Sequence, residues 1–228
     1  MNTTYRQELK YRISAAEKET LISRLSAVLQ PDTHADANGR YVVRTLYFDD
    51  INDTAMTQSL NGQPQKTKYR VRMYNGDPSF IRLERKVKHY SGSCKTGECI
   101  SPEECQSLIR GEYDYLLRSS SPFLNACYAD FTSRLLRPKI VVQYTRHAFI
   151  CPQDAIRITI DENVAVCSIP ESFSAESDFF GISVFENRQC VLEVKYTHYM
   201  PDYVLALIGV IDRTRVSTSK YVAGRLIY

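Results

Sequence analysis

Charged and apolar residues alternate along several short segments of the chain, at the spacing of β-strands. Residues 68–72 read Lys-Tyr-Arg-Val-Arg, and residues 82–88 repeat the pattern. Because successive strand side chains point to opposite faces, one face of each segment is charged and the other is largely apolar. The residues that share the charged faces are Lys68, Arg70, Arg72, Arg82, Glu84, Lys86 and Lys88.

These two segments are expected to pair as a hairpin. Asn75-Gly76-Asp77-Pro78 between them is typical of a tight turn that joins strands at about 66–74 and 79–88. Like charges about 5 Å apart on paired strands destabilise the sheet unless an anion lies between them. The pattern therefore predicts a binding surface for a polyanion, with a solvated charged face as the alternative.

The rest of the chain mixes segments of both periods. Ser14 with Glu17, and Ser101 with Glu104, form capping boxes that begin helices. The further strands are expected at 4–13, 41–48, 139–149, 155–163, 189–196 and 216–221. The helices are expected at 14–30, from a cap at 49–53 to about 60, at 101–111, in two pieces over 113–136 broken at Pro122, and at 201–211. Loops are expected at 91–97 and 168–187.

Strands with one charged and one apolar face predict an unusual barrel, because ordinary barrels fill their interior with apolar side chains. If the charged faces point inward, helices must cover the apolar faces from outside. We therefore expect an α+β fold: an antiparallel closed β-barrel of about eight strands that forms a hydrophilic tunnel, with helices packed outside. A half-open sheet with its charges toward solvent is the alternative. No linker divides the chain, so residues 1–228 are expected to be one domain.

Composition sharpens this picture. The formal net charge is only +3, yet residues 66–95 hold nine Lys or Arg against two acids. Such a concentration favours a local anion site over general adhesion to nucleic acid or membrane. Seven scattered cysteines are typical of reduced thiols in the cytoplasm, and no apolar stretch approaches the length that crosses a bilayer. We expect a soluble cytoplasmic protein that binds no nucleic acid.

Candidate chemistry lies on the charged faces. Arg and Lys recognise phosphate through charge-assisted hydrogen bonds, so many of each suit a chain of phosphates. Glu193, between Leu192 and Val194, is the best candidate ligand for a divalent metal, and Asp161 could assist it. Glu84 is either a metal ligand or a salt-bridge partner. No Gly-rich phosphate-binding loop occurs, so side chains must hold any nucleotide phosphates.

Eight motifs in one order resemble the VTC domain, the catalytic polyphosphate polymerase domain of the vacuolar transporter chaperone complex. That domain is a member of the triphosphate tunnel metalloenzyme (CYTH-like) superfamily. The motifs are Glu8-Leu-Lys10-Tyr11, Leu46-Tyr-Phe-Asp49, Lys68-Tyr-Arg-Val-Arg72-Met-Tyr74, Leu83-Glu-Arg-Lys86, Tyr144-Thr-Arg146, Arg157-Ile-Thr-Ile-Asp161, Leu192-Glu-Val-Lys195-Tyr and Ser219-Lys-Tyr221.

The resemblance implies a transferase that moves the γ-phosphate of ATP onto a growing polyphosphate chain, using a divalent metal, Mn²⁺ or Mg²⁺. The catalytic residues it implies are Arg70, Arg72, Lys86, Arg146, Arg157 and Lys220. It also implies Lys10, Lys95 and Ser219 as substrate-binding residues and Glu193 as the metal ligand. From the charged faces we add Lys68, Glu84, Lys88 and Lys195 to the substrate-binding residues, and Glu8 and Asp161 to the metal ligands. ATP and polyphosphate are the expected partners. A membrane partner is compatible with this reading but is not encoded in the chain.

Two other functions stay open. A tunnel triphosphatase would hydrolyse triphosphate or nucleotide, and such relatives open with Glu-x-Glu-x-Lys. Here that position reads Arg6-Gln-Glu8-Leu-Lys10, so Arg replaces one carboxylate. A non-catalytic module that binds polyphosphate or inositol phosphates would keep the cations but would not depend on metal.

Overall fold

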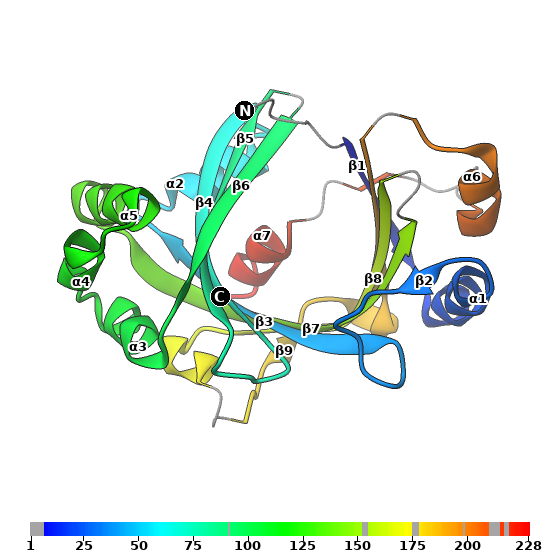
Figure 1. Cartoon of the computed structure of the whole chain (residues 1–228), viewed down its shortest axis with the longest axis horizontal. Helices are drawn as coiled ribbons and strands as arrows, with labels where there is room; N and C mark the ends of the chain where they lie inside the picture. The colour runs from blue at the N-terminus through cyan, green and yellow to red at the C-terminus, as the bar shows by residue number, and fades with distance from the viewer. Residues whose placement is uncertain are drawn as a thin grey trace. The chain divides into compact units, whose positions relative to one another are not determined.

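The computed structural model describes residues 7–90, 92–151, 155–174, 178–197, 199–209, 215–216 and 219–228. Its strands (Figure 1) are β1 (Gln7–Ile13), β2 (Gln30–Pro31), β3 (Arg40–Asp49), β4 (Gln65–Tyr74), β5 (Ile81–His89), β6 (Gly92–Ile100), β7 (Arg137–Cys151), β8 (Ile156–Cys167), β9 (Ile182–Ser183) and β10 (Cys190–Tyr196). Its α-helices are α1 (Ala15–Ser26), α2 (Thr54–Leu60), α3 (Pro102–Arg110), α4 (Asp114–Arg118), α5 (Pro122–Ser133), α6 (Asp202–Ile208) and α7 (Lys220–Arg225). Two 3₁₀ turns are η1 (Pro170–Phe173) and η2 (Glu186–Arg188).

The strands form one sheet in the order β1-β10-β8-β7-β3-β4-β5-β6, with β2 paired to β7 and β9 paired to β8. The pairs β1–β10, β10–β8, β3–β4, β4–β5 and β5–β6 are all antiparallel. The predicted α+β fold with an antiparallel sheet is confirmed. In the part of the chain that the structure describes, however, the two end strands β1 and β6 do not pair with each other. Hydrogen bonds therefore do not close the predicted barrel.

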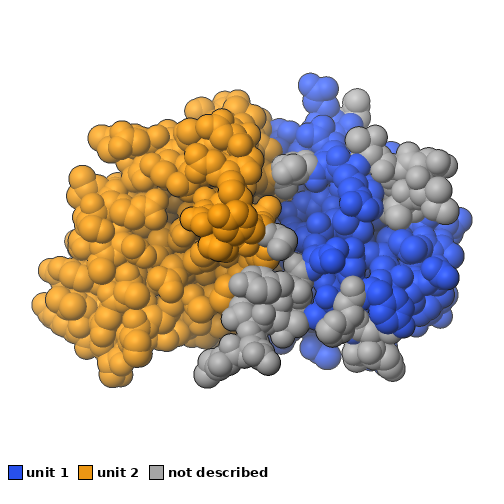
Figure 2. Space-filling model, turned by 90° about the horizontal axis from the view of Figure 1, so that it is seen from above, with its two compact units in different colours: residues 1–42, 144–164, 183–218 blue, residues 43–143, 165–182, 219–228 orange. Residues whose placement is uncertain are grey.

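The chain divides into two compact units, shown in different colours in Figure 2. Unit 1 holds residues 1–42, 144–164 and 183–218. Unit 2 holds residues 43–143, 165–182 and 219–228. Each unit therefore combines segments that lie far apart in the sequence.

In unit 1, helices cover the apolar faces of the strands, as predicted. Leu21 and Leu25 of α1 and Val204 of α6 are buried with Tyr11 of β1 and Leu192 of β10. A fully buried side chain of this size contributes roughly 1.5–3 kcal/mol relative to exposure. The predicted capping box at the start of α1 is also present.

Unit 2 repeats this arrangement around a second core. Val71 of β4 and Leu83 of β5 are buried with Leu108 of α3 and Phe131 of α5. Helix α3 begins at its predicted capping box, and α5 begins at Pro122, where the sequence predicts a break. These helices pack on the apolar faces of β4 and β5. Because successive side chains point to opposite faces, the charged residues lie on the other face of those strands.

Local turn chemistry agrees with the sequence at two points. Asn75 and Gly76 both adopt positive φ between β4 and β5, as their turn requires. Near the start of α2, Asp50 accepts a backbone hydrogen bond from Thr54 at 3.0 Å, and Asp49 accepts bonds from Ala55 and Met56. Asp49 and Asp50 therefore cap this helix, as predicted, whereas the side chain of Asp53 at the N-cap position makes no capping hydrogen bond.

Strand β6 contradicts the predicted loop at 91–97. Its polar, Gly-containing sequence has no apolar alternation, but it pairs with β5 along its whole length. At Gly97 a Cβ atom would lie 2.6 Å from the Leu83 carbonyl oxygen. Glycine here thus allows close approach of two strands rather than marking a loop.

The predicted strand at 216–221 is also wrong where the structure describes it. Helix α7 begins at Lys220, and the Ser219 side chain accepts a hydrogen bond from the Val222 amide. The predicted loop at 168–187 contains η1, β9 and the start of η2, and Phe173 and Phe185 within it are buried.

All seven cysteines are free, and only Cys94 and Cys99 are exposed. Within the described ranges, none of the helices has the length and apolar character needed to cross a membrane.

Candidate functional site

The charged face of unit 2 carries cations in register across three strands. Lys68 of β4 lies opposite Lys86 of β5, and Lys86 lies opposite Lys95 of β6. Opposed residues of an antiparallel ladder have Cα atoms about 4.5–5.5 Å apart, and like charges so placed destabilise the pair. The predicted opposition of like charges is confirmed, and a bound anion would relieve it.

Two more pairs of cations flank this row. Arg72 lies opposite Arg82, and Lys66 lies opposite Lys88. Arg82 also donates a hydrogen bond to the Gly97 carbonyl at 2.7 Å, which fixes its guanidinium against β6. Because a strand rises about 3.4 Å per residue, the positions of Lys66 and Arg72 are about 20 Å apart along β4.

One carboxylate, Glu84, lies among these cations and is only 1% exposed. It accepts a hydrogen bond from Arg70 at 2.7 Å and one from Lys95 at 3.0 Å, and Arg72 lies 3.7 Å away. Burial raises the pKa of Glu84, but the charges of Arg70, Arg72 and Lys95 outweigh burial and lower this pKa to about 2. Glu84 is therefore a counter-ion that orients three cations, which favours its salt-bridge role over metal binding.

Helix α7 lies against the charged side of β3 and β4, unlike the helices of the two cores. Lys68 Nζ donates to the Ser219 hydroxyl at 2.9 Å and lies 5.3 Å from the centre of the Tyr221 ring. The Tyr221 ring packs on Tyr47 of β3 with ring centroids 5.1 Å apart. The expectation that helices pack outside the sheet is therefore wrong for α7, which brings Ser219 and Tyr221 to Lys68 of the cation row.

Hydrogen bonds hold α7 in place. The buried Tyr221 hydroxyl donates to Asp49 at 2.6 Å, and burial raises the pKa of this tyrosine. Arg225 donates to both oxygens of Asp53, at 2.7 and 2.8 Å, and this lowers the pKa of Asp53 to about 2. Acids at the start of α2 thus position the helix that carries Ser219 and Lys220.

The charged face of unit 1 carries acids as well as cations on its paired strands. Lys10 lies opposite Glu193, and Lys195 lies opposite both Glu8 and Arg157. Lys10 forms an ion pair with Glu8, and Lys195 forms one with Glu193 at 2.5 Å. Burial lowers the pKa of Lys10, but Glu193 and Glu8 outweigh it, so the pKa is raised and Lys10 stays charged.

Two arginines of unit 1 are held by buried carboxylates. Arg146 donates to both oxygens of the fully buried Asp161, at 2.6 and 2.8 Å. Arg157 donates to Asp32 at 2.5 Å. Burial lowers the pKa of Lys195, and the charge of Arg146 lowers it further. The bidentate pair orients Arg146 in a fixed plane, the geometry suited to phosphate oxygens.

The predicted metal ligands do not form a cage. Among the described residues, no three His, Cys, Asp or Glu side chains are grouped so that they could hold a metal ion. Glu193 is 6% exposed and lies opposite Thr159, whose buried hydroxyl has no hydrogen-bond partner in the described part of the chain. A hard divalent ion accepts one carboxylate together with phosphate oxygens and water, so Glu193 with Thr159 fits such an ion.

The structure places the predicted site residues in two groups. In unit 2 they are Lys68, Arg70, Arg72, Glu84, Lys86, Lys88, Lys95, Ser219 and Lys220. In unit 1 they are Glu8, Lys10, Arg146, Arg157, Asp161, Glu193 and Lys195.

Sequence reasoning missed polar residues on the same faces. Thr45 lies opposite Arg72, and its buried hydroxyl has no hydrogen-bond partner among the described residues. Tyr47 lies opposite Arg70 and supports Tyr221. Extending the alternation of charged and apolar faces into the predicted strand at 41–48 would have found both.

Comparisons with known proteins agree with this architecture. The family model of the VTC domain matches residues 5–228. A candidate adenylate cyclase from Bacillus halodurans is similar in structure, with TM-score 0.55, 15% identity, and 94% of this chain and 95% of that chain covered. A candidate adenylyl cyclase from Hippeastrum, described as having a dominant triphosphatase activity, has TM-score 0.55, 16% identity and coverage of 97% and 95%. No curated protein matches the chain.

Proposed function

Because this chain belongs to the VTC domain family, we propose that it is a polyphosphate polymerase that transfers the γ-phosphate of ATP to a growing polyphosphate chain. The observation that carries the proposal is the row Lys68, Lys86 and Lys95, where three like charges lie side by side. A chain of phosphates is the substrate class that neutralises such a row.

The reaction needs positioning more than proton transfer. A terminal oxygen of polyphosphate, already ionised, attacks the γ-phosphorus of ATP. A new oxygen–phosphorus bond forms, the bond from the γ-phosphorus to the bridging oxygen breaks, and ADP leaves with the electron pair. No general base is obligatory, so aligned cations that offset charge supply most of the catalysis.

Roles follow from the contacts of each side chain. Arg70 and Arg72, oriented by Glu84, would bind the phosphates in unit 2 together with Lys86. Arg146, held by Asp161, would bind phosphate in unit 1. Ser219 and Lys220 would contribute from the N-terminus of α7.

Glu193 is the residue we propose for metal binding, with Thr159 beside it. Mn²⁺ or Mg²⁺ held there would neutralise charge on phosphate oxygens. Glu193 pairs with Lys195, just as Glu8 and Asp161 pair with Lys10 and Arg146. The Thr159 hydroxyl, which has no hydrogen-bond partner among the described residues, lies opposite Glu193, and on this ground we assign the metal to Glu193 and the other two acids to orienting cations.

The predicted tunnel in a single domain is part of the proposal. A crystal structure with bound tripolyphosphate tests it, since a closed ring of strands around the ligand is expected. A sheet that stays open around the ligand would contradict the predicted tunnel.

A triphosphatase is the second candidate, favoured by the activity described for the Hippeastrum neighbour. Water would then replace polyphosphate as the nucleophile. Purified protein incubated with ATP and Mn²⁺ distinguishes the candidates on a urea gel. Long phosphate ladders support the polymerase, and orthophosphate alone supports the triphosphatase. Tight binding of polyphosphate without either product supports a non-catalytic module.

A further inference from the structure

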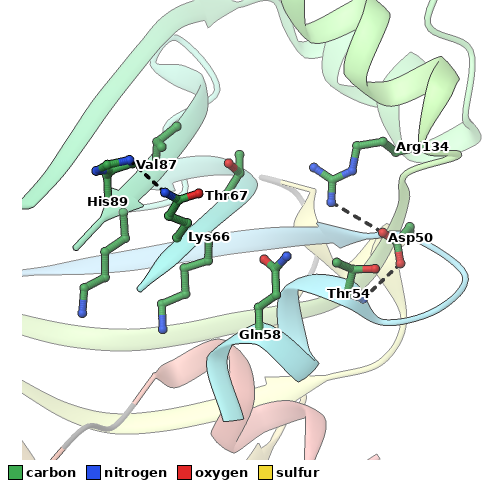
Figure 3. Close-up of a pocket in the computed structure, with 10 residues that line it drawn as sticks. Asp50, Thr54, Gln58, Lys66, Thr67, Val87, His89 and Arg134 are labelled. Carbon is green, nitrogen blue, oxygen red and sulfur yellow. Dashed lines mark hydrogen bonds and ion pairs between the residues drawn. The ribbon is translucent and has the colours of Figure 1, made fainter. Parts of the chain in front are cut away.

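A pocket of about 460 Å³ lies at the end of the β4–β5 ladder in unit 2. Figure 3 shows its lining residues, which come from the start of β4, the end of β5, the segment before α2, α2 itself and the end of α5. They are Asp50, Thr54, Gln58, Gln65, Lys66, Thr67, Val87, Lys88, His89 and Arg134. Lys88 among them is a substrate-binding residue predicted from the sequence, but none of the predicted catalytic residues lines the pocket.

The pocket is cationic and polar. Lys66 and Lys88 lie opposite each other in the ladder, so their side chains leave the same face of the two strands. Arg134 adds a third charge and lies 3.5 Å from Asp50, the one acid among the lining residues. Counting the two lysines, the arginine and the aspartate, the formal charge of the lining is therefore +2, which favours an anionic ligand.

Lys66 and Lys88 continue the cation rows of the proposed site, whereas Gln65, Thr67, Val87 and His89 alternate with them on the other face of the two strands. Lys66 and Lys88 are each two residues from Lys68 and Lys86 on the same strand faces. Two residues of strand correspond to about 7 Å, so the pocket begins one such step beyond the row of three lysines. Together the rows extend over about 20 Å, longer than the triphosphate of one nucleotide.

We propose that this pocket binds the part of a long polyphosphate chain that extends beyond the reacting phosphates. The inference rests on the proposed function and deepens it, because it names the chain itself as a ligand of a separate subsite. A nucleobase fits less well, since no Phe, Tyr or Trp is among the described lining residues to stack on it. Lys and Arg beside Gln and Thr donors match phosphate oxygens instead.

The test compares long-chain polyphosphate with tripolyphosphate by isothermal titration calorimetry. In the Lys66→Gln/Lys88→Gln variant, affinity for the long chain should fall about tenfold or more, because two charge-assisted contacts are lost. Affinity for tripolyphosphate should change less than about twofold, since that ligand fits within the remaining rows. The matched control, Arg110→Gln/Arg118→Gln, removes two exposed charges from α3 and α4 and should alter neither affinity.

The proposal is overturned if the Lys66→Gln/Lys88→Gln variant loses affinity equally for both ligands or loses affinity for neither. It is also overturned if the control variant loses as much affinity for the long chain. Loss of ATP affinity alone in the Lys66→Gln/Lys88→Gln variant would identify a nucleotide site and also overturn it. Circular dichroism and thermal unfolding check that both variants are folded. If the wild type shows the predicted chain-length dependence but makes no polyphosphate from ATP, the polymerase proposal fails while the subsite stands.

Discussion

Arg70 donates from Nε to the buried carboxylate of Glu84 at 2.7 Å, between neighbouring strands of the same sheet. Lys95 reaches the other oxygen of Glu84 from the edge strand β6. One acid therefore links three strands and compensates part of a dense positive charge. A substrate phosphate approaching this face would meet cations that are already oriented.

Acid should weaken the fold through Glu84. In the folded protein the pKa of Glu84 is about 2, below its ordinary value of 4.5. The contribution of the ionised carboxylate to the free energy of unfolding is therefore fully present above about pH 5 and is lost as the pH falls through 2. This shift corresponds to about 3 kcal/mol. Urea denaturation measures the free energy of unfolding of the wild type and of Glu84→Gln. The difference between the two should become smaller as the pH falls from 5 to 2.

Glu112→Gln is the matched control, because Glu112 forms an exposed pair with Arg110. Its unfolding free energy should follow the wild type across the same pH range. If Glu84→Gln did so as well, Glu84 would not be an ionised counter-ion in the folded protein.

Metal binding and phosphate binding should separate in two variants. Glu193→Gln should abolish turnover but largely retain polyphosphate affinity, because the cations remain. Arg70→Ala should lose both, because it removes a phosphate donor and leaves Glu84 with one fewer partner. Turnover assays and calorimetry measure the two effects, and normal turnover in Glu193→Gln would refute its assignment to the metal.

The Tyr221 hydroxyl should make a measurable contribution to the anchoring of α7. Tyr221→Phe removes the donor to Asp49, a buried bond to a charged group, and should reduce the free energy of unfolding by about 2 kcal/mol. Tyr196→Phe removes an exposed hydroxyl bonded to Gln7 and should change it by less than about 0.5 kcal/mol. Equal effects of the two substitutions in thermal unfolding would show that Tyr221 does not anchor α7.

Gly97 should be essential to the pairing of β5 with β6. In Gly97→Ala the new methyl group would meet the Leu83 carbonyl oxygen, a backbone atom that cannot turn aside, so a loss of about 1–3 kcal/mol is expected. Hydrogen exchange should show faster exchange of β6 amides than in Thr96→Ala, which changes an exposed side chain of the same strand. Unchanged exchange would mean that β6 tolerates the contact.

Much of the fold was predictable because local signals were strong. The alternation at residues 68–72 and 82–88, the turn at Asn75 and Gly76, and the capping boxes at Ser14 and Ser101 each specify structure within a few residues. The structure contains the elements that these signals predict.

The missed elements depend on partners outside their own residues. Strand β6 forms because β5 provides a partner, and its own residues carry no period. Helix α7 is anchored by Asp49 and Asp53, far earlier in the chain, and its Gly224 allows close packing on Val166 and Ile140. The cation rows were predictable from alternation, whereas the counter-ion role of Glu84 required the register of three strands.

The most direct test of the central claim is the product formed from γ-labelled ATP with Mn²⁺ and a short polyphosphate primer. We predict that label enters a ladder of lengthening phosphate chains and that ADP forms in equal amount. Release of the label only as orthophosphate, with the primer unchanged, would contradict the account.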